Sequence, residues 1–215
     1  MNIGVLGTGM VGQTIATKLV QIGHNVMMGS RTGDNPKAMN WAKEEGHNAY
    51  HGTFADAASF GEIIINCTLG AGSVEALNLA GAENLKGKIL IDTSNPIDYS
   101  TEITTLTVCN TDSLGEQIQR AFPEARVVKT LNTMNANVMV NPAKLIEYTN
   151  VFVSGNDGEA KAIVTGYLRE WFGWKSVIDL GDITTSRGVE MFLLLWFSLR
   201  RVVIAKRMNI KLVTS

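Results

Sequence analysis

The residues best suited to chemistry form a glycine-rich turn close to the amino terminus. Asn2-Ile3-Gly4-Val5-Leu6 is a short apolar run, and Gly7-Thr8-Gly9-Met10-Val11-Gly12 follows it directly. This glycine spacing is typical of a turn that holds the pyrophosphate of a dinucleotide. Gly7 permits the tight turn, Gly9 lets a pyrophosphate approach the backbone, and Gly12 lets a helix pack against the strand. The alternative, a glycine-rich turn without a ligand, fits this context less well.

The end of the next apolar run indicates which dinucleotide is bound. Proteins that prefer NAD usually carry an acid there, which accepts a hydrogen bond from the ribose 2′-hydroxyl. This chain has Gly29-Ser30-Arg31 instead. A hydroxyl and a guanidinium fork suit a 2′-phosphate, so the pattern predicts NADP(H). Lys37 is a further candidate for contact with this phosphate, although a first-turn lysine after Pro36 also fits a water-facing position.

Other candidate ligand contacts lie in loops that follow later strands. The predicted cofactor-binding residues of these loops are Thr68, Leu69, Asn95, Asn132, Thr133 and Met134. None of the loops offers a Ser-His-Asp set, a carboxylate pair or a Cys/His cluster, so we predict neither a catalytic side chain nor a metal site. For the asparagines a purely structural role in loops is an equal alternative. Cys67 fits a small buried residue better than a nucleophile, because no partner base is visible.

The lack of an acid–base residue restricts the reaction class. A dehydrogenase that acts on an alcohol or carbonyl needs a proton donor or acceptor beside the hydride path. Hydride transfer between a nicotinamide and a flavin-like ring needs mainly stacking and alignment. The polar and apolar loops of this chain favour the second task.

The elements that must position these residues alternate regularly. Strand and helix patterns follow one another six times within residues 1–135, which predicts a Rossmann-type, doubly wound parallel sheet that binds NADP(H). Residues 136–215 are expected to form a small α/β C-terminal region. Its last helix, Arg187 to about Lys206, is apolar on almost all sides. Because a helix of this kind must be covered, we expect it to mediate a homodimer.

Composition and charge restrict the binding partners and the cellular location that we expect. A net charge of −1 over 215 residues provides no field for nucleic acid or an acidic membrane. The two cysteines, Cys67 and Cys109, have no metal or framework spacing and indicate a reducing compartment. The first strand begins at residue 2 without a leader pattern, and the longest apolar stretch is too short to span a bilayer. We therefore expect a cytoplasmic protein whose partner is a small-molecule hydride acceptor.

Several of these segments together resemble the F-420-dependent NADP oxidoreductase family, in which F-420 is a deazaflavin that carries hydride. The resemblance rests on four segments: Gly7–Gly12, Gly29–Arg31, Lys129–Met134, and Asp182-Ile183-Thr184-Thr185-Ser186-Arg187-Gly188-Val189-Glu190-Met191. It implies a Rossmann domain with a small C-terminal domain, a homodimer, and hydride transfer between NADPH and the deazaflavin. It also implies that Thr8, Met10, Val11, Ser30 and Arg31 hold the nucleotide, and that Leu69 and the Asn132–Met134 loop border the nicotinamide.

One departure leaves the hydride acceptor open. The archaeal members have His where this chain has Asn132. Asn132, together with Asp92-Thr93-Ser94-Asn95, is also similar to the cytoplasmic oxidoreductase domain of the Steap metalloreductases, which passes hydride from NADPH to FAD. The acceptor is thus left open among F-420, an ordinary flavin (FAD or FMN) and another molecule. Two alternatives are an NADPH-dependent reductase of a small carbonyl or imine substrate and a non-catalytic NADP(H) sensor.

Overall fold

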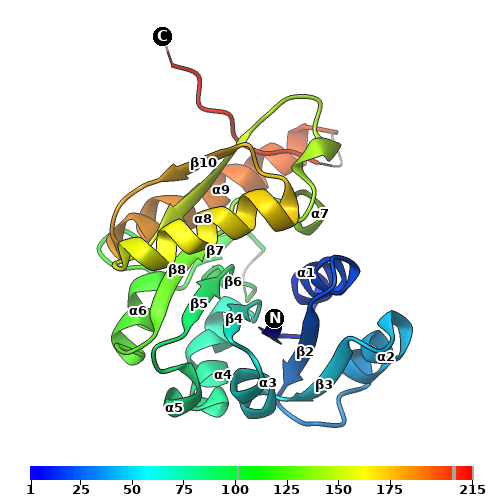
Figure 1. Ribbon diagram of the computed structural model, residues 1–215. Coiled ribbons are helices and arrows are strands. Elements are labelled where there is room, and N and C mark those ends of the chain that lie inside the picture. The colour runs from blue at the N-terminus through cyan, green and yellow to red at the C-terminus, as the bar shows by residue number, and fades with distance from the viewer. Residues whose placement is uncertain (101, 205–206, 215) are drawn as a thin grey trace.

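The computed structural model describes residues 1–100, 102–204 and 207–214. Its core is an eight-stranded sheet in the order β10-β9-β8-β5-β4-β1-β2-β3 (Figure 1). The six strands from β3 to β8 in this order run parallel, while β9 pairs antiparallel with β8 and parallel with β10. After β3, at one edge of the sheet, the chain crosses back to β4, so the strand order reverses between β1 and β4. Such sheets bind nucleotides at this point of reversal.

The element bounds are as follows. The strands of the large sheet are β1 Asn2–Leu6, β2 Asn25–Ser30, β3 Ala49–Thr53, β4 Ile63–Asn66, β5 Ile89–Asp92, β8 Arg126–Thr130, β9 Asn150–Ser154 and β10 Ser176–Asp179. The α-helices are α1 Met10–Gln21, α2 Pro36–Glu45, α3 Phe54–Phe60, α4 Ser73–Ala80, α5 Ala82–Leu85, α6 Leu114–Ala121, α7 Ala136–Met139, α8 Gly158–Phe172 and α9 Ser186–Val202. Short 3₁₀ turns cover Gly70–Gly72, Pro142–Lys144 and Ile183–Thr185.

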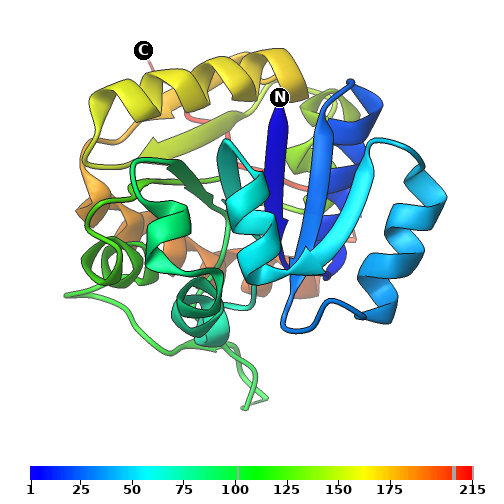
Figure 2. The same ribbon diagram turned by 60° about the horizontal axis from the view of Figure 1, so that its bottom comes forward.

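Strand residues alternate between two apolar layers, one on each face of the sheet. In β4, Ile63 and Ile65 belong to the cluster that also contains residues of α1, α2, α7 and α8, whereas Ile64 belongs to the cluster with residues of α3, α4, α5 and α6. Because successive side chains of a strand point to opposite faces, the near-continuous apolar runs serve both layers. This confirms the predicted doubly wound α/β fold (Figure 2).

Local sequence signals account for several helix ends. Thr53 forms a capping box with Asp56 at the start of α3. Ser113 caps α6 by accepting from the Glu116 amide. The segment between β5 and α6 contains a small antiparallel hairpin of β6 Ile97–Asp98 and β7 Thr105–Leu106. A two-residue strand is too short to leave an alternating pattern in the sequence.

The C-terminal region extends the large sheet. β9 hydrogen-bonds directly to β8, so the sheet continues across the predicted division at residue 135. α9 ends at Val202 and Val203 is extended, although the apolar pattern predicts a longer helix; the β-branched run Val202-Val203-Ile204 has low helix propensity. Lys206, the expected end of the helix, lies outside the described residues.

His24, in the turn between α1 and β2, should make stability depend on pH. Its ring lies edge-on to Trp171 of α8, with 5.0 Å between ring centroids, and its Nε2 atom is buried without a partner in the described structure. Burial, and secondarily the positive amino terminus, lowers the pKa of His24 below its ordinary value of 6.5.

Because the folded state resists protonation of His24, we expect the free energy of unfolding to fall as pH drops through 6.5 toward the lowered pKa. Urea midpoints measured at intervals from pH 8 to pH 5 should show this loss, and the His24→Gln variant should flatten it. An unchanged slope in the variant would contradict this origin of the pH dependence.

Candidate functional site

The glycine turn has the geometry of a pyrophosphate cradle. Gly7 has a φ of +115°, and a Cβ there would lie 2.7 Å from the carbonyl oxygen of Cys67. A Cβ on Gly9 would meet nothing within 4 Å, so the space above it is open. A Cβ on Gly12 would collide with the carbonyl oxygen of Gly7. The turn therefore needs two glycines for its own packing and leaves the third facing open space.

The start of α1 offers donors to an anion at this turn. Gly9 is the N-cap residue and its backbone carbonyl accepts from Gln13, but no side chain caps the helix. The amides of Met10, Val11 and Gly12 therefore lack intrahelical partners. The side chain of Gln13 instead donates to the carbonyl oxygen of Thr8 over 3.0 Å, which stiffens the turn. Met10 is 77% exposed, a notable exposure for an apolar side chain beside the turn.

The two candidate 2′-phosphate ligands at the end of β2 differ in availability. Ser30 is buried, and its hydroxyl donates to the carbonyl oxygen of Thr32 over 2.6 Å. Arg31 is exposed, and its Nη2 atom lies 3.7 Å from the position that a Cβ of Gly72 would take. The guanidinium thus reaches from β2 toward the loop after β4. Lys37 is in the first turn of α2, with its side chain exposed.

The loops after β5 and β8 meet through two asparagines. Asn95 Nδ2 donates to the Asn132 carbonyl oxygen and Asn132 Nδ2 donates to Asn95 Oδ1, each over 2.9 Å. Asn132 Nδ2 also donates to the carbonyl oxygen of Val189 on α9, over 3.1 Å. A carbonyl oxygen only accepts, which fixes the orientation of this amide. At the start of the loop after β8, Leu131 takes a left-handed φ of 63°, which is strained for a leucine.

The remaining candidates divide into exposed and enclosed residues. Leu69 is 69% exposed, and the Thr68 hydroxyl contacts Asn66 Oδ1 and the Ser73 hydroxyl, each over 2.7 Å. Thr133 and Met134 are buried, and Met134 packs in the apolar layer on the α1 face. The structure therefore gathers Leu69, Asn95 and Asn132 at this edge of the sheet, but Asn132 is only 3% exposed and is as enclosed as Thr133 and Met134.

A row of buried polar side chains underlies the asparagine pair, and the sequence did not lead us to it. Asn66, Asp92 and Lys129 are in register at the ends of β4, β5 and β8. Lys129 Nζ lies 2.8 Å from Asp92 Oδ2 and 2.8 Å from Glu190 Oε1. Burial lowers the pKa of Lys129, but the carboxylates of Asp92 and Glu190 outweigh it and hold the pKa above its ordinary value. A polar residue at the end of each apolar run was the available signal; the partner on α9 was not visible.

Cys67 lies directly behind the glycine turn and is unsuited to nucleophilic chemistry. Burial raises the pKa of its thiol to about 12, against a hydrogen bond from Thr93 that lowers it. Cys109 is exposed and is likewise a free thiol. Since the thiolate is the reactive form, iodoacetamide at pH 8 should alkylate Cys109 and leave Cys67 unmodified. Mass spectrometry of wild type and Cys109→Ser would check this; rapid labelling of the variant would contradict it.

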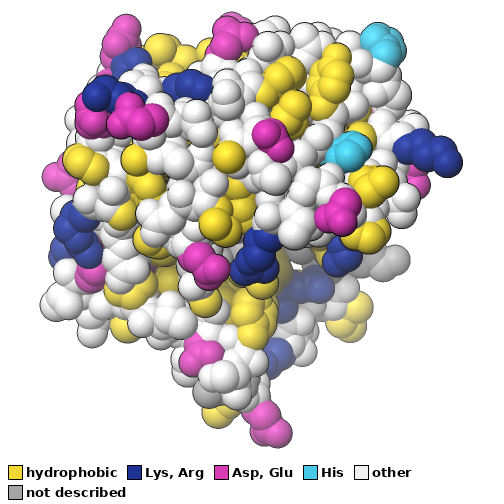
Figure 3. All heavy atoms as spheres, turned by 90° about the horizontal axis from the view of Figure 1, so that it is seen from below, with side chains coloured by type: hydrophobic (Ala, Val, Ile, Leu, Met, Phe, Trp, Pro, Cys, Tyr) yellow, Lys and Arg dark blue, Asp and Glu magenta, His cyan; other side chains and the backbone are white. Residues whose placement is uncertain are grey.

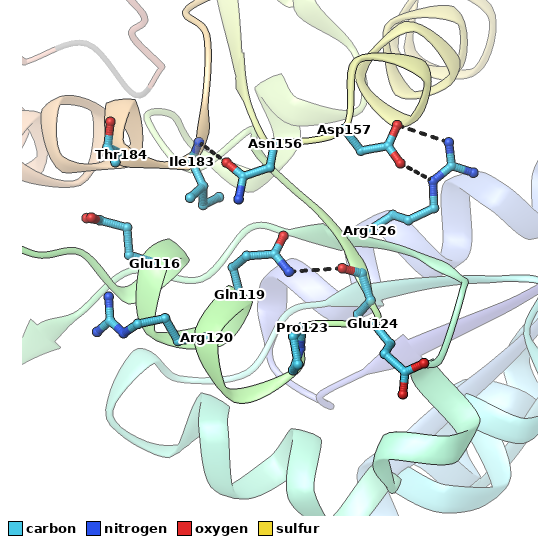
Figure 4. A pocket seen from close by; sticks show the side chains of 11 residues that line it. Glu116, Gln119, Arg120, Pro123, Glu124, Arg126, Asn156, Asp157, Ile183 and Thr184 are labelled. Carbon is cyan, nitrogen blue, oxygen red and sulfur yellow. Dashed lines mark hydrogen bonds and ion pairs between the residues drawn. The ribbon is translucent and has the colours of Figure 1, made fainter.

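Figure 3 shows a hollow on the underside of the molecule, with apolar side chains on its wall and Lys and Arg side chains beside it. A second hollow, of about 760 Å³, lies beside α6 at the start of β8 (Figure 4). Charged side chains there already have partners: Arg126 pairs with Asp157 over 2.6 Å, and Glu116 pairs with Arg187. Because β8 starts at the sheet edge opposite its carboxyl end, this hollow is separate from the glycine turn.

The described residues contain neither a metal-binding cluster nor a membrane-spanning helix. Within them, no group of His, Cys, Asp and Glu side chains is arranged to hold a metal ion. No helix among them is long and apolar enough to cross a membrane.

The sequence of the chain matches a family of NADP oxidoreductases and a curated metalloreductase. Residues 2–96 match the family described as NADP oxidoreductase, coenzyme F-420-dependent. The metalloreductase STEAP3 of Rattus norvegicus is 31% identical over 191 residues, which make up 88% of this chain and 36% of that protein. The chain thus spans about a third of the length of this curated relative.

Solved structures extend the similarity to the whole chain. A protein from Arthrobacter sp. FB24, provisionally named an F-420-dependent NADP reductase, is 48% identical, with a TM-score of 0.93 over 99% of each chain. A reductive aminase from Aspergillus terreus, solved with NADPH and ethyl levulinate, has a TM-score of 0.66 at 22% identity over 93% of this chain and 61% of that chain. The second likeness shows a common fold alone. From the first likeness and the match of residues 2–96, the chain belongs to the NADP-dependent oxidoreductase family described as coenzyme F-420-dependent.

Proposed function

We propose that this protein transfers hydride between NADP(H) and a flavin-like acceptor, either the deazaflavin F-420 or FAD or FMN. The observation that carries the proposal is the character of the sheet edge beside the glycine turn. The titratable groups that β5 and β8 bring there, Asp92 and Lys129, are buried and paired. The other candidate side chains at this edge are amide, hydroxyl and apolar groups. Such groups suit the alignment of two rings better than proton transfer to a carbonyl.

The residues that would hold NADP(H) follow the strand order across the switch point between β1 and β4. The free amides at the start of α1 would bind the pyrophosphate, and Arg31 would bind the 2′-phosphate. Met10 and Leu69, both largely exposed, would cover the dinucleotide on either side. Lys37 would add positive charge near the phosphate.

The Asn95–Asn132 pair would border the nicotinamide. Both hydrogens of Asn132 Nδ2 are engaged, by Asn95 Oδ1 and by the Val189 carbonyl. Its Oδ1 atom is therefore the part of the amide left to accept a hydrogen bond from the carboxamide of a nicotinamide. When bound, NADPH supplies the hydride; the residues of the chain fix the nicotinamide and exclude water. Thr68, Thr133 and Met134 would shape this part of the site from below.

The deciding experiment offers F-420, FAD and FMN in turn to the purified protein with NADPH under anaerobic conditions, and follows the absorbance of both partners. We expect stoichiometric loss of NADPH and reduction of at least one acceptor. Failure with all three would overturn the proposal. If NADPH still binds in that case, a non-catalytic sensor is the remaining explanation.

A reductase of small carbonyl or imine substrates is the second candidate, favoured by the fold shared with the reductive aminase. The chain covers only 61% of that protein, however. Oxidation of NADPH that depends on a cyclic imine and needs no flavin would establish this alternative.

We also propose that the protein is a homodimer. Along α9, Val189 and Leu193 are buried, whereas Leu194, Leu195, Leu199 and Val202 are between 36% and 76% exposed. Such an apolar stripe is typical of a surface that another chain covers. Sedimentation equilibrium should give twice the chain mass, and Leu195→Glu should shift it to the monomer. A cytoplasmic location is proposed as well, supported by the two free cysteines.

A further inference from the structure

The buried ion cluster of Asp92, Lys129 and Glu190 is unusual because the side chains of all three residues are almost completely inaccessible. The exposed side-chain fractions are 0% for Asp92 and Lys129 and 1% for Glu190. Glu190 Oε2 accepts from the Leu114 amide over 2.8 Å, and Oε1 accepts from the Gly115 amide over 3.0 Å. The cluster thus connects β5, β8, α9 and the start of α6.

The cluster is part of a closed ring of contacts that includes the asparagine pair. Lys129 Nζ donates to the carbonyl oxygen of Ser94 over 2.6 Å, and Ser94 directly precedes Asn95. Glu190 directly follows Val189, whose carbonyl oxygen holds Asn132. The two asparagines then close the ring through their reciprocal hydrogen bonds. Each amide is therefore attached to the cluster through its own neighbour in the chain.

Stability alone is a weak reason for such a cluster. Well-packed apolar side chains often stabilise a buried position as well as an ion pair does, and the sheet has large apolar layers on both faces. The ring also holds a strained segment, because Leu131 keeps its left-handed φ of 63° between Lys129 and Asn132. Strained backbone of this kind persists where surrounding contacts over-determine it, often at ligand sites.

We propose that Asp92, Lys129 and Glu190 position the Asn95–Asn132 pair for the nicotinamide half of NADP(H). The inference rests on the proposed function in that NADP(H) is the ligand, but not on the identity of the hydride acceptor. Lys129 is a positioning residue, because its buried ammonium group has no route to a substrate. Its contacts act on the two amides that border the carboxamide in the proposed site.

The test compares two ligands that share the adenosine end but differ in the nicotinamide. NADP⁺ contains both halves, whereas adenosine 2′,5′-bisphosphate lacks the nicotinamide and the second phosphate. Titration calorimetry would measure both affinities for the full-length wild type and for the Asp92→Asn/Lys129→Met/Glu190→Gln variant, which is neutral and leaves no unpaired buried charge. Lys86→Met, at the exposed Lys86–Glu124 pair, is the matched control.

We expect the neutral variant to lose at least about tenfold in affinity for NADP⁺, while its affinity for adenosine 2′,5′-bisphosphate stays close to wild type. Equal losses for both ligands would mean general damage, and no loss for either would mean a structural role only; each outcome overturns the inference. If the triple variant does not fold, Glu190→Gln decides on the same criterion, since it keeps the size and one accepting oxygen of the side chain.

This design separates the inference from the proposed function. A wild type that binds NADP⁺ but reduces none of the flavins would end the acceptor proposal and leave the positioning test intact. A wild type that binds NADP⁺ no more tightly than adenosine 2′,5′-bisphosphate would end the positioning inference, because the nicotinamide would then contribute nothing.

Discussion

Arg31→Glu is expected to weaken NADPH binding by at least tenfold, or about 1.4 kcal/mol, and to leave NADH binding unchanged or improved. Arg31 is exposed at the end of β2 and makes no hydrogen bond or ion pair within the described part of the chain. Its guanidinium is therefore available for a 2′-phosphate, and a carboxylate in its place would repel one. The same carboxylate is well placed to accept from a ribose 2′-hydroxyl.

Equilibrium titration with both nucleotides checks this prediction. Because Arg31 is exposed and unpaired, the melting temperature without ligand should not change. Lys43→Glu, in the last turn of α2, makes the same charge change away from the glycine turn and should leave the NADPH/NADH ratio unaltered. Equal loss of both nucleotides in Arg31→Glu would mean that the arginine does not distinguish them.

Gly12→Ala and Gly9→Ala should both abolish tight NADPH binding, but for different reasons. A methyl group at Gly12 meets the backbone carbonyl of Gly7, so either the turn or α1 must move. We expect a loss of roughly 1–3 kcal/mol in the free energy of unfolding, together with the loss of binding. At Gly9 the methyl group meets open space and φ is −78°, which alanine adopts readily. Stability should therefore stay unchanged there while the pyrophosphate is kept away.

Urea denaturation and NADPH titration on the two variants separate these effects. Gly158→Ala offers a control, since its Cβ also meets nothing within 4 Å and the residue starts the distant helix α8. If Gly9→Ala binds NADPH as tightly as wild type, the pyrophosphate does not approach the backbone at Gly9. An unaffected stability of Gly12→Ala would mean that α1 relaxes without cost.

The fold was largely predictable because its signals are local. Most strands of the parallel sheet contain a compact apolar run, and the glycine turn and capping residues mark where helices begin. The presence of Ser30 and Arg31 in place of an acid is likewise visible from adjacent residues in the sequence. Local patterns fail only where they are short, as in the β6–β7 hairpin, or where helix propensity falls, as at the end of α9.

The sequence by itself thus determined the βαβ unit, the doubly wound sheet and the residues that we propose to favour NADP(H), because each depends on neighbours along the chain. Tertiary structure alone decided how the edge of the site is held. Asn66, Asp92 and Lys129 form a row only through strand register, and Glu190 reaches Lys129 from a helix 61 residues later. The reciprocal Asn95–Asn132 pair and the enclosure of Met134 likewise depend on packing. Such contacts join segments distant in sequence, and no spacing of residues encodes them.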